Sequence, residues 1–172
     1  EDLSTLPLDM IAVFDVQPVR TSFYQSLGID FDYYTPTNAI SFLDDCHAAS
    51  KACGAAMALK RKRKIGALVH PVYESFVDRL MKKSDFVAIN SDVSASRLIE
   101  KCIAVVSMPF TSTALLGRAL GKPSAYYDPH GMIQRDDRAA HGIDVLLGPR
   151  ELRAWLANVR TPYFSGDNGV IN

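Results

Sequence analysis

Short apolar runs alternate along the chain with longer segments in which apolar residues recur at helical spacing. The short runs are typical of buried parallel strands, and the longer segments are typical of amphipathic helices. The pattern predicts strands at 10–14, 32–34 (the weakest), 55–59, 86–89, 103–106, 125–127 and 145–147. It predicts helices at 21–27, from 35 through 49, from His70-Pro71 through Met81, and at 94–101, 111–120 and 150–159.

Strands that alternate with helices predict βα units. The expected fold class is therefore α/β, a three-layer α/β/α Rossmann-like domain with a mainly parallel sheet. We expect a linker at 1–9, the domain at 10–160 and a loose tail at 161–172. Because the chain opens on Glu1 within a polar stretch, it is expected to be an excised domain or a fragment.

Composition limits the classes of function that the chain could have. The 172 residues have room for one well-packed domain, and 19 basic residues balance 19 acidic ones, so net charge does not favour a nucleic-acid partner. Three cysteines without metal-ligand spacing are predicted to be buried thiols of a reducing cytoplasm. No apolar run approaches the ~20 residues of a membrane span, so a cytoplasmic location is expected, with association at the inner face of the membrane through the parent protein.

The strongest candidate site is the segment Pro109-Phe110-Thr111-Ser112-Thr113, between a predicted strand and a predicted helix. Ligands of parallel sheets bind beyond the carboxyl ends of the strands, where helix amino termini point. Free amide groups, the helix dipole and hydroxyls together suit a phosphate. One of these hydroxyls could instead serve as an ordinary helix cap, but three in a row exceed what capping requires.

A second candidate is the unbroken basic run from Lys60 to Lys64, directly after a predicted strand. Lys60 and Lys62 are placed to neutralise a diphosphate or a sugar carboxylate, and a solvated loop is the alternative. His70, at a helix start with Glu74 one turn later, could bind phosphate or transfer a proton. It could equally be a surface or core histidine.

Acidic residues supply the remaining candidates. Asp15 ends the first strand and is a candidate catalytic base or ribose ligand, with a turn cap as the equal alternative. Asp128 is expected to cap a turn, and 135–138 to form an exposed loop. Because no Asp-x-Asp follows a strand, we expect neither a metal nor a cofactor beyond a nucleotide-sugar substrate.

These residues resemble a known family. The string PFTS at 109–112, with Gly-Lys-Pro at 121–123 and Tyr-Tyr-Asp-Pro at 126–129, is similar to the signature of polysaccharide biosynthesis PFTS motif proteins, and the likeness covers about 10–157. The resemblance implies the carboxyl-terminal, donor-binding half of a GT-B glycosyltransferase. It also extends to CMP-sugar transferases for sialic acid or Kdo, which place a His-Pro element and a Ser/Thr element on the donor phosphate.

Carried over, His70-Pro71 matches the first element and Thr111, Ser112 and Thr113 match the second. Those enzymes often have Lys-Pro-His-Pro directly after the strand, so Lys60 or Lys62 is the alternative to His70. We therefore expect sugar transfer from a nucleotide-sugar, with CMP-sugar favoured, to a glycan acceptor. A missing amino-terminal Rossmann-like domain would be the partner and would supply the base.

Two other classes of function fit the sequence. One is a non-catalytic assembly domain of polysaccharide machinery, for which Ser112→Ala and Lys60→Ala would change no phenotype of the parent protein. The other is a sugar-nucleotide epimerase, whose product would be an isomer rather than a transferred sugar.

Overall fold

The computed structural model describes residues 3–28, 32–61 and 65–160. In this part of the chain six parallel strands form one sheet in the order β3-β2-β1-β4-β5-β6. The strands are β1 (Met10–Phe14), β2 (Ala56–Lys60), β3 (Phe86–Ile89), β4 (Ala104–Ser107), β5 (Ser124–Asp128) and β6 (Asp144–Leu147). The predicted fold class is confirmed.

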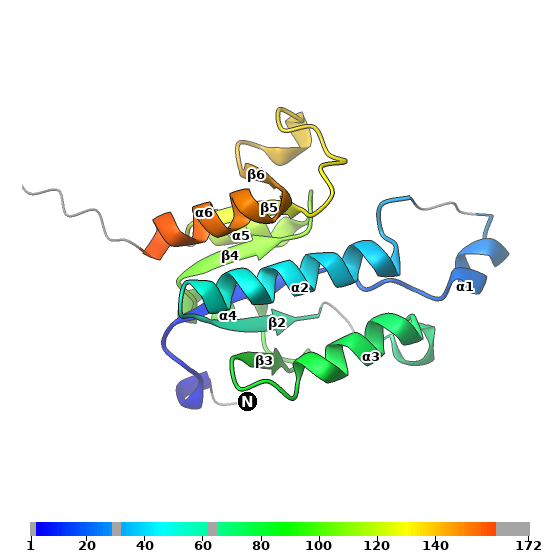
Figure 1. Cartoon of the computed structure of the whole chain (residues 1–172), viewed down its shortest axis with the longest axis horizontal. Coiled ribbons are helices and arrows are strands. Elements are labelled where there is room, and N and C mark those ends of the chain that lie inside the picture. Colours follow the sequence, from blue (N-terminus) through cyan, green and yellow to red (C-terminus); the bar gives the residue numbers. More distant parts are fainter. Residues whose placement is uncertain (1–2, 29–31, 62–64, 161–172) are drawn as a thin grey trace, which may run out of the picture.

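Helices cover both faces of the sheet (Figure 1). One face carries α2 (Pro36–Ala52), α3 (Pro71–Leu80) and α6 (Gly148–Arg160), and the other carries α4 (Ala95–Lys101) and α5 (Ser112–Ala119). The remaining described helices are α1 (Thr21–Ser26), which projects from the body in Figure 1, and the 3₁₀ turns η1 (Leu3–Thr5), η2 (Gly66–Leu68) and η3 (Arg138–Ala140).

The sequence explains these layers locally. Side chains of β1 alternate between the two cores, Ile11 and Val13 on the side of α2 and Ala12 on the side of α4. The Thr35 hydroxyl accepts from the Asn38 amide at 3.2 Å and so caps α2.

A glycine sets the distance between α5 and the sheet. A Cβ on Gly117 would lie 2.8 Å from Cγ2 of Val105 and closer still to Oγ of Ser124. The helix therefore lies as near the sheet as a residue without a side chain allows.

The strand order creates one place where the chain changes direction across the sheet. From β1 the chain builds outward through β2 and β3, and then crosses to β4 on the other side of β1. In open parallel sheets this point, beyond the carboxyl ends of the two central strands, is where ligands bind. Here the two loops touch, since the Met108 amide donates to Phe14 O at 2.9 Å and the Val16 amide to Met108 Sδ at 3.1 Å.

Three expectations are corrected. The predicted strand at 32–34 is a bend, in which the rings of Tyr33 and Tyr34 pack edge to face and the Asn38 side chain holds the Tyr33 carbonyl. The strand expected to end at Leu59 includes Lys60. Cys53 is partly exposed rather than buried, although it is free like the other two cysteines.

Candidate functional site

The turn between β4 and α5 is built by its own hydroxyls. Thr113 Oγ1 lies 2.8 Å from Ser107 Oγ and 3.2 Å from Thr111 Oγ1. The Thr111 hydroxyl itself donates to Met108 O at 2.9 Å. Two of the three consecutive hydroxyls therefore hold the turn in shape.

Phe110 gives this turn its sharpness. Its φ of 62° lies in the left-handed region, which costs a bulky residue about 1–2 kcal/mol. The ring packs edge to face on Tyr126 with centroids 5.8 Å apart, and the Tyr126 hydroxyl donates to Thr111 O at 3.0 Å. Strain of this kind persists where the surroundings hold it, and it gathers at functional sites.

The start of α5 is left open toward solvent. Thr111 is the N-cap residue, but its side chain makes no capping hydrogen bond because it is turned back to Met108. Ser112 is exposed, and its hydroxyl has no hydrogen-bond partner among the described residues. The first-turn amides and the Ser112 hydroxyl can therefore donate to an anion, with the helix dipole in support.

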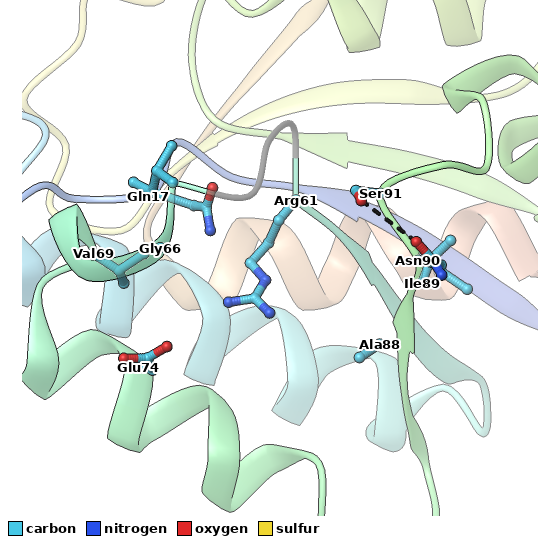
Figure 2. A pocket seen from close by; sticks show the side chains of 10 residues that line it. Gln17, Arg61, Gly66, Val69, Glu74, Ala88, Ile89, Asn90 and Ser91 are labelled. Atoms are coloured by element: carbon cyan, nitrogen blue, oxygen red, sulfur yellow. Dashed lines mark hydrogen bonds between the residues drawn. The ribbon is translucent and has the colours of Figure 1, made fainter.

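A cavity of about 510 Å³ opens beside this switch point, at the carboxyl ends of β1, β2 and β3. Its size is that of a small-molecule site. Figure 2 shows Arg61 reaching into it from the end of β2, with Glu74 of α3 on the opposite wall. Gln17, Val69, Ile89 and Asn90 also line it.

Asp15 directly follows β1 and is held by a tyrosine. The side chain is 6% exposed, its Oδ2 accepts a short hydrogen bond from the Tyr73 hydroxyl, and its Oδ1 has no partner among the described residues. Burial raises the pKa of Asp15 to about 6, against the opposing effects of the Tyr73 hydrogen bond and the Arg61 charge. A buried carboxyl that titrates near neutrality marks a candidate functional position.

Lys60 does not line the cavity that Arg61 enters, but its ammonium binds the backbone of two residues that do. It is 7% exposed, and its ammonium donates to the carbonyl oxygens of Ser91 at 3.0 Å and Asn90 at 3.5 Å. Burial lowers the pKa of Lys60, and the charge of Asp92 acts against that shift. Lys60 thus ties the end of β2 to the loop after β3. Lys62 lies outside the described residues.

His70 is the N-cap residue of α3 and makes no capping bond through its side chain. Its Nδ1 is buried without a hydrogen-bond partner among the described residues, and its backbone amide donates to Pro18 O at 2.9 Å. The catalytic roles of His70 and Asp15, and the phosphate role of His70, stay predictions. Pro109 is buried within the β4–α5 turn.

Other acidic candidates have structural tasks. Asp128 is fully buried and accepts from the amides of His130 at 3.2 Å and Ile133 at 2.7 Å, as expected of a turn residue. The predicted loop at 135–138 is exposed, and Arg135 forms a two-pronged ion pair with Glu151.

Sequence reasoning missed Tyr73 and Arg61 as site residues. Tyr73 is 58 positions from Asp15 and had no local signal. Arg61 stands in the basic run noted in the sequence, but its approach to Asp15 depends on the strand register, in which Val13 pairs with Leu59. Two residues further along each strand, Asp15 and Arg61 follow on one face of the sheet.

The chain was compared with known proteins. The family model of polysaccharide biosynthesis PFTS motif proteins matches residues 2–156. Among curated proteins, none matches the sequence. A similar solved structure is KpsC, a beta Kdo 2,4 transferase from Thermosulfurimonas dismutans, with 14% identity and a TM-score of 0.46. The match covers 89% of this chain and 44% of that one, so this chain spans less than half the length of that relative.

None of the helices within 3–28, 32–61 and 65–160 has the length and apolar content that crossing a bilayer requires.

Proposed function

Because the chain belongs to the polysaccharide biosynthesis PFTS motif family, we propose that it is the donor-binding domain of a glycosyltransferase and holds the phosphate of a nucleotide-sugar at the start of α5. One observation carries the proposal: an uncapped helix start with an outward Ser112, beside the point where the strand order reverses.

The chemistry follows from donors that are fixed before a ligand arrives. When a sugar leaves its nucleotide, negative charge grows on the phosphate oxygens. The first-turn amides of α5 and the Ser112 hydroxyl stabilise that charge without rearranging, because Thr111 and Thr113 already hold the turn. The base that activates the acceptor would belong to another domain, since the Asp15 carboxyl is buried.

Calorimetric titration with CMP, UDP, GDP and ADP tests the proposal, and the resemblance to CMP-sugar transferases puts CMP first. Ser112→Ala removes one hydrogen bond to a charged group and should weaken binding roughly tenfold to a hundredfold. Failure of all four nucleotides to bind folded protein would count decisively against the idea.

Ser112→Asp gives a sharper test, because it moves stability and binding in opposite directions. A carboxylate in the first turn of α5 should stabilise the helix by about 0.3–1 kcal/mol while it repels the phosphate. Ser96→Asp places the same charge in the first turn of α4 and is the matched control, expected to bind nucleotide normally. Equal binding by the two variants would contradict the assignment to α5.

A further inference from the structure

The cavity beside α3 differs in charge from a phosphate site. Among its described lining residues, the charged ones are Arg61 and Glu74, which have opposite signs. The Arg61 charge also acts on Asp15, whose pKa it lowers, so a second carboxylate lies within its field. Within the described residues, no carboxylate forms an ion pair with Arg61 at salt-bridge distance. The guanidinium is thus balanced in charge while its donors remain available.

Lys60 does not itself line the cavity, and its ammonium is already bound to protein. It donates to the carbonyl oxygens of Asn90 and Ser91, two residues that do line the cavity. Among the described residues that line the cavity, a doubly charged phosphate would meet one carboxylate, Glu74, and one cation, Arg61. The uncapped start of α5 is therefore the better place for phosphate.

The polar groups that do line the cavity suit hydroxyls. Arg61 donates, Glu74 accepts, and Gln17 can do both, which is what a ring of hydroxyl groups requires. Figure 2 shows these three side chains arranged around the same space, reached from three different segments of the chain. Val69 and Ile89 supply apolar wall, against which the C–H face of a sugar ring can pack.

We propose that this cavity is a sugar-binding subsite, separate from the phosphate site at α5, in which Arg61 and Glu74 bind the hydroxyls of one sugar ring. The class of ligand rests on the proposed function in polysaccharide synthesis. The assignment of the subsite rests on the side chains that line the cavity.

Amide chemical shifts measured by NMR test the two sites separately. Glucose, galactose, N-acetylglucosamine and glucuronate would each be titrated to ~100 mM, which detects millimolar dissociation constants. At least one should move the amides of Gly66, Val69 and Ser91, whereas inorganic phosphate should move those of Ser112 and Thr113. Arg61→Gln and Glu74→Gln should each weaken the sugar response about tenfold and leave the phosphate response unchanged.

Arg153→Gln, which removes one positive charge from an exposed position on α6, is the matched control and should change neither response. The subsite is wrong if no sugar moves the cavity amides, or if Arg61→Gln binds sugar as well as the unaltered protein. The proposed function fails independently, through loss of nucleotide binding at α5.

The source of the sugar is distinguished with a nucleotide-sugar that binds. If its own sugar fills the cavity, Arg61→Gln weakens the nucleotide-sugar but not the bare nucleotide. If the cavity holds the acceptor, a free monosaccharide still moves the cavity amides when the nucleotide-sugar is saturating. Either outcome supports the subsite, and binding of both molecules without any effect of Arg61→Gln overturns it.

Discussion

Asp15→Asn is predicted to make the protein more stable at neutral pH, although it alters a residue of the candidate site. Burial raises the pKa of Asp15 from its ordinary 3.8 to about 6 in the folded state. A difference of this size corresponds to about 3 kcal/mol. Well below pH 4 the carboxyl is protonated in both states, and the raised pKa costs no stability. As the pH rises from 4 to 6 the unfolded chain releases its proton first, so the stability is progressively lost.

An asparagine cannot ionise, yet its side-chain oxygen can still accept from the Tyr73 hydroxyl. The difference in unfolding free energy between Asp15→Asn and the unaltered protein should therefore grow by up to about 3 kcal/mol between pH 4 and 7. Urea unfolding followed by fluorescence of Trp155, the single tryptophan, measures this difference. All other groups titrate alike in both proteins and cancel.

Asp44→Asn, at an exposed position of α2, provides the control and should give a difference within about 0.5 kcal/mol at every pH. A flat difference curve for Asp15→Asn, or a variant that is less stable than the parent at pH 7, would refute the reasoning. Confirmation of the pH dependence would show that the Asp15 carboxylate lowers the stability of the fold at neutral pH, as residues of functional sites often do.

Three further predictions concern packing and charge. Gly117→Ala gains helix propensity but forces a Cβ to 2.8 Å from the buried Val105, so we expect a net loss of about 1–2 kcal/mol in urea unfolding. Phe110 has a left-handed φ of 62°, which glycine adopts more easily than alanine because it has no Cβ. Phe110→Gly should therefore be about 1 kcal/mol more stable than Phe110→Ala in urea unfolding. His47 lies 2.8 Å from Asp85 and lowers the pKa of that carboxyl, mainly through the hydrogen bond. The pair therefore stabilises the fold above pH 4 and loses this effect as acid protonates Asp85, so Asp85→Asn should cost about 1–2 kcal/mol at pH 7 and less at pH 3 in thermal unfolding.

Much of the fold could be predicted because most strands and helices are encoded by a local pattern of apolar and capping residues. The buried run at 10–14 became β1, and Thr35 and Pro36 marked the start of α2 as expected. The order of the strands could not be predicted, because it depends on which side of β1 the chain crosses to after β3. The predicted strand at 32–34 was wrong for a local reason. Aromatic residues favour strands in general, but here Tyr33 and Tyr34 pack on each other.

The turn between a strand and a helix at 107–112 could be predicted, but the different contacts of its hydroxyls could not. The hydroxyls at 111–113 look alike in sequence, yet Thr111 and Thr113 bond inward while Ser112 is exposed. That difference depends on Ser107 and Met108 at the end of β4. The contact of Tyr73 with Asp15 could not be predicted, because nothing in the sequence around a helical tyrosine indicates a partner 58 positions away.

The pleat of β2 divides a run of like charges into two kinds of residue. Lys60 is the last residue of the strand and its ammonium donates to two backbone carbonyl oxygens, whereas the next residue, Arg61, lines the cavity. Replacing each of these two residues by an uncharged one should therefore have different effects. The change at Lys60 should impair folding, and the change at Arg61 should alter ligand binding. A count of charged residues in the sequence overstates the field of such a run, because the buried Lys60 ammonium is already bound to backbone carbonyl oxygens.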